Sequence, residues 1–148
     1  VKAANAQGWD DVTWLYLTSV YSENFADAID DAGAGIYVPA EFYPFTDDSD
    51  INADWRALME ENDIPLTSFS QGGYLAATYF IEVLKSIDGD ITRESVSEAL
   101  KGMDPIENPM VGTPYAFGTQ NTAGWPIILK SGTNAWEKVA DDWLRIGE

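Results

Sequence analysis

The sequence predicts an α/β fold built around a parallel strand-helix-strand unit, with helices on both faces of the sheet and a small antiparallel addition near the C-terminus. Three observations predict it. Runs of β-branched, aromatic and apolar residues occur at 12–17 and 36–38, a helical pattern separates them, and turn signals divide the chain beyond residue 110. A strand, a helix and a strand at this spacing form a parallel pair with a right-handed crossover.

The first elements follow in order. Residues 2–7 have the pattern of a helix end, before the strand at 12–17. Ser22 is placed to cap the next helix, because a serine there accepts a hydrogen bond from a free backbone N–H group. The helix residues expected to face the core are Phe25, Ala28, Ile29 and Ala32. The sequence Gly33-Ala34-Gly35 is expected to end this helix.

A loop at 39–50 leads to another helix, which is expected to stop before Ile64-Pro65. The side chains expected on its packed face are Trp55, Leu58 and Met59. The residues that alternate as in a calcium-binding loop are Asp48, Asp50, Asn52 and Asp54. However, Ala53 and Met59 occupy the positions of the glycine and the bidentate glutamate that this loop needs. We therefore expect Ser49 or Asp50 to cap the helix and no calcium site to form.

A long apolar helix is predicted from Phe69, and two apolar stripes lie side by side along it. The stripes comprise Tyr74, Ala77, Ile81 and Leu84, and beside them Ala76, Phe80, Val83 and Ile87. Such a pattern is typical of a helix packed on most sides.

A second, shorter helix follows a break at Gly89-Asp90. Thr92 is a good N-cap, so this helix is expected to start near Arg93 and to end where Gly102 takes a left-handed conformation. Its expected inward side comprises Val96, Ala99, Leu100 and Met103. Beyond residue 110, turn signals at 112–114, 118–124 and 131–134 separate three short strands. These strands are expected near 115–117, 127–130 and 136–139.

The composition excludes several classes of function. With 25 acidic and eight basic residues, the formal charge of −17 disfavours nucleic acid and anionic membrane surfaces as partners. No run approaches the ~20 apolar residues of a transmembrane helix and no leader opens the chain, so a mature soluble protein is expected. The chain lacks histidine and cysteine, the usual bases, nucleophiles and zinc ligands, so we expect no enzyme activity, cofactor or metal.

The candidate ligand site lies where the two strands of the unit end, because ligands of open α/β sheets bind at the carboxyl ends of the strands. Two hydroxyls, a carboxylate and three aromatic rings meet there, and polar residues at the start of the long helix are further candidates. The candidate ligand-binding residues are Thr18, Ser19, Tyr21, Glu41, Phe42, Tyr43, Ser70 and Gln71. Simpler alternatives are that the rings belong to the core, that Glu41 is solvated, and that Ser70 and Gln71 only cap the helix.

Several short motifs carry a resemblance to a known family. They are Gly73-Tyr74-Leu75-Ala76-Ala77, the break at 89–94, Ala99-Leu100-Lys101-Gly102 and Tyr115-Ala116-Phe117-Gly118. Together with the order of elements from about Ala4 to Val139, they resemble the type I periplasmic binding proteins of ABC importers, in the branched-chain amino acid group. The resemblance implies two lobes that close over a small-molecule ligand and present the closed form to membrane permeases. It also implies a periplasmic or other extracytoplasmic protein, lipid-anchored or secreted.

Members of this family are much longer, so the resemblance implies that the chain is a C-terminal part. It assigns residues 1–66 to the C-terminal lobe, the helix pair at 67–109 to the other lobe, and residues 110–148 to the C-terminal lobe again. Separated from its own sheet, the long helix would expose apolar area that promotes association.

The loop after the first strand departs from the family pattern. Leucine-type binders place an acidic residue there to pair with the ligand's ammonium group, whereas residues 18–21 carry no acid before Glu23. This departure favours an aromatic or other carboxylate over an amino acid as ligand. Two alternatives to an importer component stay open: a ligand-sensing receptor domain of the same fold, and an acidic interaction domain that binds no ligand.

Overall fold

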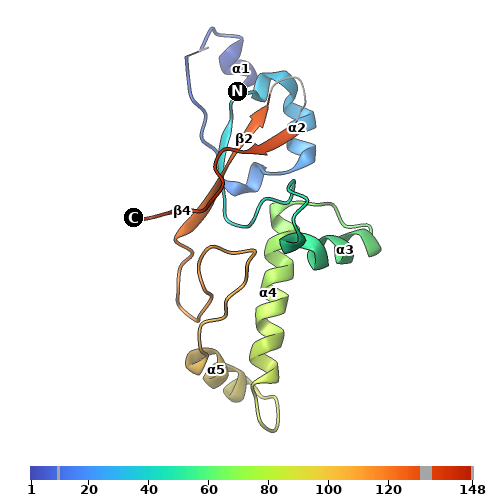
Figure 1. Cartoon of the computed structure of the whole chain (residues 1–148), viewed down its shortest axis with the longest axis vertical. Helices are drawn as coiled ribbons and strands as arrows, with labels where there is room; N and C mark the ends of the chain where they lie inside the picture. The colour runs from blue at the N-terminus through green and yellow to red at the C-terminus, as the bar shows by residue number, and fades with distance from the viewer. Residues whose placement is uncertain (10, 131–134, 148) are drawn as a thin grey trace.

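The helices and strands of this computed structural model form two groups along the long axis of the molecule (Figure 1). The structure describes residues 1–9, 11–130 and 135–147, so the predicted turn at 131–134 lies outside the described residues. The helices are α1 (Lys2–Asn5), α2 (Glu23–Ile29), α3 (Ala53–Glu61), α4 (Ser68–Lys85) and α5 (Arg93–Gly102). The strands are β1 (Tyr37–Ala40), β2 (Ala123–Lys130), β3 (Ala135–Lys138) and β4 (Leu144–Arg145). The sheet, α1 and α2 lie at one end, α4 runs away from them, and α5 lies at the far end.

The sheet is organised around β2, which pairs antiparallel with β1, β3 and β4. In this register Val38 lies opposite Ile127, and Leu129 opposite Trp136. The antiparallel strands predicted near 127–130 and 136–139 are confirmed. The strand predicted near 115–117 is reduced to one antiparallel bridge between Ile106 and Tyr115.

The strand predicted at 12–17 forms a single parallel bridge, between Leu15 and Tyr37. The amide of Tyr37 donates to the carbonyl of Trp14, and the amide of Tyr16 donates to the carbonyl of Tyr37, both at 2.9 Å. The parallel part of the sheet is therefore much shorter than predicted, although the α/β class is confirmed. Leu15 and Leu17 are 73% and 77% exposed. Their apolar side chains lack the covering layer that buries the strands of parallel sheets.

Helix α2 begins where the sequence predicts, because Ser22 Oγ accepts a hydrogen bond from the amide of Phe25 at 3.2 Å. It ends at Ile29 and continues as a 3-10 turn, η2 (Asp30–Gly33). The buried residue of this helix is Ala26, whereas Ala28, which was expected to face the core, is exposed. The packed face is therefore centred on Phe25, Ala26 and Ile29, and the prediction for Ala28 is wrong.

Helix α3 also has a narrower packed face than predicted. Trp55 and Met59 are buried, but Leu58 is 42% exposed. The helix follows a 3-10 turn, η3 (Asp50–Asn52), whose first free amide, that of Ile51, donates to Ser49 Oγ at 3.3 Å. Ser49 thus caps the 3-10 turn, whereas α3 itself begins after Asn52 with no side-chain cap, so the prediction that Ser49 or Asp50 caps the helix holds only for the turn that leads into it.

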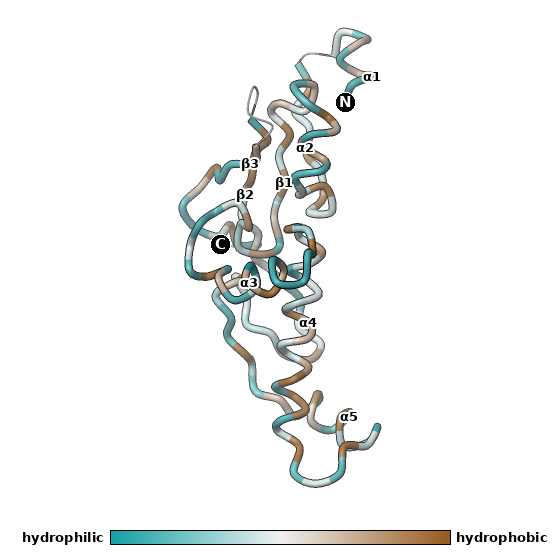
Figure 2. The backbone as a smooth tube through the Cα atoms, turned by 90° about the vertical axis from the view of Figure 1, so that its right-hand side faces the viewer, coloured by the Kyte–Doolittle hydropathy of each residue, from teal (hydrophilic) through white to brown (hydrophobic). Residues whose placement is uncertain are grey.

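Helix α4 is long, as predicted, but it is packed along one stripe instead of on most sides. The buried residues of the stripe are Ser68, Gln71, Leu75, Tyr79 and Val83. Phe80 and Ile81, which were expected to pack, are 46% and 48% exposed. Figure 2 shows apolar residues recurring along the length of α4. The sequence pattern therefore provides more apolar surface than the described residues cover.

Helix α5 begins at Arg93, as predicted, with Thr92 Oγ1 accepting from the amide of Ser95 at 3.1 Å. The predicted left-handed end at Gly102 is wrong. Gly102 is the last helical residue, and Met103 then turns the chain into an extended conformation with a φ of −68°. None of the described helices has the length and apolar character needed to cross a membrane.

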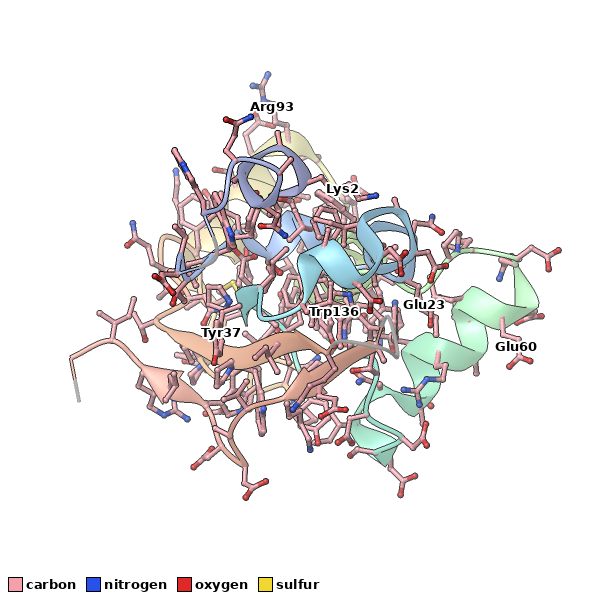
Figure 3. The ribbon with its side chains drawn as sticks, turned by 90° about the horizontal axis from the view of Figure 1, so that it is seen from above. Lys2, Glu23, Tyr37, Glu60, Arg93 and Trp136 are labelled. Atoms are coloured by element: carbon pink, nitrogen blue, oxygen red, sulfur yellow. The ribbon has the colours of Figure 1, made fainter. Side chains whose placement is uncertain are left out.

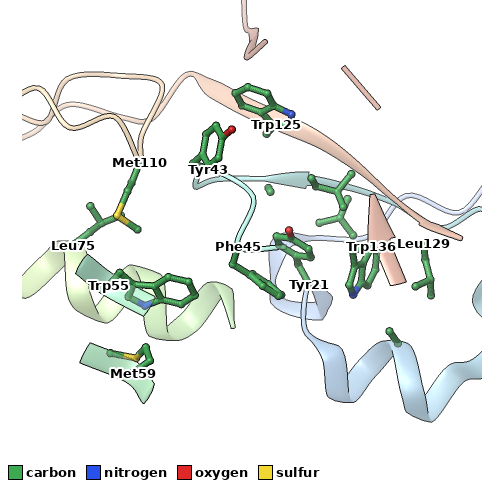
Figure 4. Packing of buried hydrophobic residues seen from close by; sticks show 14 of the residues in the cluster. Tyr21, Tyr43, Phe45, Trp55, Met59, Leu75, Met110, Trp125, Leu129 and Trp136 are labelled. Atoms are coloured by element: carbon green, nitrogen blue, oxygen red, sulfur yellow. The ribbon is translucent and has the colours of Figure 1, made fainter. Parts of the chain in front are cut away.

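An aromatic cluster fills the core at the sheet end (Figure 4). The Tyr21 ring stacks on Phe45, with ring centroids 4.1 Å apart, and meets Trp136 edge-on at 5.5 Å. Trp136 Nε1 donates to the carbonyl of Ser22 at 2.9 Å, which ties β3 to the start of α2. Seen from above in Figure 3, Trp136 lies between the sheet and the helical segments, while Glu60 and Arg93 lie at the periphery.

Gly112 provides a test of close packing beside β2. A Cβ atom at Gly112 would lie 2.5 Å from Ala123 Cβ and 2.6 Å from Trp143 Cδ2. Gly112→Ala should therefore lower the free energy of unfolding by about 1–3 kcal/mol, measured by urea denaturation. Gly73→Ala is the control, because it meets open space on α4 and should raise stability by about 0.5–1 kcal/mol. Equal stability of the two variants would contradict this packing.

The buried phenol of Tyr21 should make the folded protein less stable at alkaline pH. Burial raises its pKa from 10.0 to about 12, so the folded state holds the phenol proton after the unfolded chain has released it. The free energy of unfolding should then fall by roughly 1.4 kcal/mol per pH unit as the pH rises from about 10 towards 12. Urea denaturation between pH 9 and 11 measures this slope. Tyr21→Phe should remove this part of it, and an identical slope in both proteins would refute the assignment.

Candidate functional site

A cleft of about 480 Å³ lies between α4, α5 and the segment 111–121. This volume is in the range of small-molecule sites. Helix α4 supplies one wall through its buried stripe, which includes Leu75, Tyr79 and Val83. Tyr115, which stacks on Tyr79, and Phe117 belong to the segment that completes the lining. The cleft therefore lies between a helix and an irregular segment that leads into β2.

The walls of the cleft are mainly aromatic and aliphatic, and its polar groups come from residues next to the sheet. The rings that line it belong to Phe42, Tyr79, Phe80, Tyr115 and Phe117. The polar lining residues are Glu41, Thr113, Thr119, Gln120 and Asn121. Asn121 Nδ2 donates to the carbonyl of Glu41 at 3.1 Å, which joins the segment after β1 to the start of β2. An apolar cleft with a few polar groups can enclose a hydrophobic body and orient a polar head.

Tyr79 is the most distinctive residue of the cleft. Its ring is 8% exposed and stacks on Tyr115, with centroids 4.5 Å apart and an angle of 7° between the planes. Its buried hydroxyl has no hydrogen-bond partner among the described residues. Burial, together with Tyr115 and Glu107, raises the pKa of this phenol, so the hydroxyl keeps its proton at neutral pH. A buried donor without a partner fits a ligand that brings an acceptor.

Two of the residues predicted from the sequence, Glu41 and Phe42, line this cleft. Phe42 is half-buried, and its ring lies over Gly72 of α4, where a Cβ atom would be 3.4 Å from Phe42 Cε2 and Cζ. Glu41 is exposed. The carboxyl end of β1 therefore leads into the cleft, as the strand-end argument predicts.

Thr18 and Ser19 lie elsewhere. Thr18 lines a second cleft of about 480 Å³ on the other side of Glu41, together with Leu17 and Pro39. The carbonyl of Thr18 accepts a hydrogen bond from Ser68 Oγ at 2.8 Å, so the loop after the first strand contacts the start of α4. Ser19 is exposed and lines neither of these clefts.

The structure places Tyr21, Tyr43 and Gln71 in the interior and gives Ser70 a capping role. Tyr21 is fully buried, and its hydroxyl lies 3.0 Å from Thr46 Oγ1. The Tyr43 ring meets Trp125 edge-on at 5.0 Å. Ser70 completes a capping box with Thr67, because its Oγ accepts from the amide of Thr67 and its own amide donates to Thr67 Oγ1, both at 3.1 Å. An aromatic ring or a hydroxyl group suits the interior, a helix cap and a ligand site alike, so the residue type alone could not show which role each residue has.

Gln71 is a buried junction between the segment after β1 and α4. Its Nε2 donates to the carbonyl of Tyr43 at 2.8 Å and to Asn52 Oδ1 at 3.2 Å. The amide of Tyr43 in turn donates to the carbonyl of Met110 at 2.8 Å. Figure 4 shows Tyr43 between Met110 and Trp125, above Leu75 and Trp55. Glu41 and Phe42, which line the cleft, thus directly precede a residue that is hydrogen-bonded to α4 and to Met110.

Sequence reasoning missed Tyr79 and the segment 111–121. Tyr79 follows Leu75 by one helical turn and precedes Val83 by another, so it belongs to an apolar stripe that shares only Val83 with the two that were predicted. This spacing could have identified its side of the helix.

Comparison with known proteins identifies relatives of the chain. A family model described as "Periplasmic binding protein" matches residues 1–127. No curated protein matches the sequence. Among solved structures, a possible leucine/isoleucine/valine-binding protein from Rhodopirellula baltica SH 1 is similar, with a TM-score of 0.77 and 20% identity over 94% of this chain. The chain spans 38% of the length of that structure. The predicted resemblance is confirmed, and the fold is part of a periplasmic-binding-protein fold.

The unpaired hydroxyl of Tyr79 can be tested without a ligand. Tyr79→Phe removes a buried donor that has no partner, so the free energy of unfolding should stay the same or rise, by up to ~1 kcal/mol. Urea denaturation of the ligand-free protein measures this. Tyr21→Phe at neutral pH is the matched control, because it removes a satisfied hydroxyl and should cost about 0.5–1.5 kcal/mol. A clear loss of stability in Tyr79→Phe would mean that the hydroxyl is already bonded.

Proposed function

The chain belongs to the periplasmic binding protein family, and we propose that it is the C-terminal part of an extracytoplasmic solute-binding protein of an ABC importer. The family match over residues 1–127 supports a binding protein. The aromatic cleft with the unpaired Tyr79 hydroxyl is the observation that carries ligand binding for this chain. In this role the protein is not an enzyme, is lipid-anchored or secreted, and delivers its ligand to permease subunits.

The proposed lobes are residues 1–66 with 110–148, and residues 67–109. The arrangement in Figure 1 supports this division, because α4 and α5 extend away from the sheet. The cleft lies where the parts meet, since its lining includes Phe42, Tyr79 and Tyr115. Closure of two lobes over a ligand is a common hinge motion of such proteins.

The proposed ligand is a small organic acid with an aromatic or other apolar body. Aromatic rings can stack on the body, and neutral donors such as the Tyr79 hydroxyl can bond a carboxylate. The loop at residues 18–21 carries no acid that would favour an ammonium group.

An amino acid is the second candidate, because the carboxylate of Glu41 lines the cleft and could pair with an ammonium group. The solved relative is described as a possible leucine/isoleucine/valine-binding protein, which makes this alternative concrete. Binding of benzoate and of L-leucine to the full-length protein separates the two ligand classes.

Ligand binding predicts unequal effects of two phenylalanine substitutions. In the full-length protein, Phe42→Ala should weaken benzoate binding by about tenfold or more, because it removes a ring from the cleft wall. Phe69→Ala is the control, since Phe69 lies outside the cleft lining. Isothermal titration calorimetry measures both. A preference for leucine over benzoate, together with loss of leucine binding in Glu41→Gln, would replace the organic acid by an amino acid.

Two other functions predict different results. A sensor of the same fold would bind ligand without a permease, and its gene neighbourhood would lack transporter genes. An acidic interaction domain would show no rise in melting temperature with any small molecule.

The exposed apolar side chains predict association of the isolated 148-residue chain. They include Phe69 and Ile81 on α4, and Leu15 and Leu17 beside β1, each at least 48% exposed. Apolar area of this extent promotes self-association. Light scattering should therefore show a dimer or a larger species, whereas a stable monomer of 16.3 kDa at micromolar concentration would contradict this.

A further inference from the structure

Lys138 of β3 contacts Tyr43 and Asp47, which follow β1 and the cleft residues Glu41 and Phe42. Its ammonium group lies over two rings, 5.7 Å from the centroid of Tyr43 and 5.6 Å from that of Trp125. It also forms an ion pair with the carboxylate of Asp47. The two charged side chains are only 31% and 21% exposed, so this pair is better shielded than the surface pair of Lys130 and Glu137. Partial burial strengthens both the ion pair and the cation–π contacts.

Asp47 connects this lysine to the turn after Tyr43. Its Oδ1 accepts hydrogen bonds from the Tyr43 hydroxyl at 3.2 Å and from the amide of Ser49 at 2.9 Å. Its backbone carbonyl accepts from the guanidinium of Arg56 at 2.7 Å. The hydrogen bond with Lys138 lowers the pKa of Asp47, and the same bond raises the pKa of Lys138, so both are charged at neutral pH.

Tyr43 links Lys138 and Asp47 to the residues that line the cleft. Its ring is held from one side by Lys138, Asp47 and Trp125, and its backbone is held by Gln71 and Met110. The two preceding residues, Glu41 and Phe42, line the cleft. Loss of the contacts on the Tyr43 ring would leave only the two backbone hydrogen bonds of Tyr43 to hold the segment that carries both.

We propose that Lys138, acting through Asp47 and Tyr43, is a positioning residue that holds Phe42 and Glu41 at the edge of the cleft. Lys138 does not line the cleft, so its effect on a ligand is indirect. The effect on ligand binding rests on the proposed function, whereas the effect on the segment does not.

The test uses the full-length protein with Lys138→Met, which keeps the aliphatic stem and removes the charge. Hydrogen exchange of the Tyr43 and Ser49 amides should become about threefold to tenfold faster, and the affinity for benzoate should fall by a similar factor. Asp47→Asn should act in the same direction, and Lys138→Arg should restore most of both readouts. Lys130→Met is the control for lost charge, since Lys130 pairs with Glu137 at 3.6 Å, and it should change neither readout.

Unchanged exchange at Tyr43 and Ser49 in Lys138→Met would overturn the proposal. Faster exchange with unchanged benzoate affinity would overturn the positioning role, and equal effects in Lys130→Met would assign them to net charge. If the wild-type protein bound neither benzoate nor L-leucine, the proposed function would fail, while the exchange readout would still decide whether Lys138 holds the segment.

Discussion

The buried side-chain amide of Gln71 joins the two ends of the molecule. It is fully buried and donates both to the carbonyl of Tyr43 and to Asn52 Oδ1, so it connects α4 to the segment after β1 and to the start of α3. Its Oε1 has no partner among the described residues, so the junction depends on the two bonds that Nε2 donates, and a buried acceptor that loses its donor costs about 1–3 kcal/mol. Helix α4 packs along one stripe, and at its start Ser68 Oγ adds a second hydrogen bond to this end of the molecule by donating to the carbonyl of Thr18.

The cleft follows from this junction. Gln71 and Tyr79 lie on the same face of α4, about two turns apart, so the point that anchors the helix also sets the position of the tyrosine. Phe42 also lines this cleft, and it directly precedes Tyr43, whose carbonyl accepts the hydrogen bond from Gln71. The buried amide of Gln71 thus helps to bring the aromatic walls of the cleft together.

The sequence allowed the helix caps to be predicted, but it did not show which apolar side chains the rest of the chain buries. Ser22, Ser49 and Thr92 were recognised as caps because capping depends on a few neighbouring residues. The strand-end argument placed Glu41 and Phe42 after β1, where they line the cleft, and ligand contact by either residue stays a prediction. The same argument could not separate Tyr21 or Tyr43 from the cleft wall, since a ring suits both places. The packed side of α4 was mistaken because a helix with several apolar stripes does not show which one the rest of the chain covers, and Tyr79 was missed for that reason.

The most direct test of this account is the free energy of unfolding of Gln71→Leu in the full-length protein, measured by urea denaturation against an exposed control, Gln7→Leu. We expect a loss of about 1–3 kcal/mol for Gln71→Leu, because the carbonyl of Tyr43 and the amide oxygen of Asn52 lose a buried donor, while removal of Gln71 Oε1, which has no partner among the described residues, offsets part of the cost. We expect almost no change for Gln7→Leu. Equal stability of the two variants would show that the buried amide does not hold α4 against the sheet.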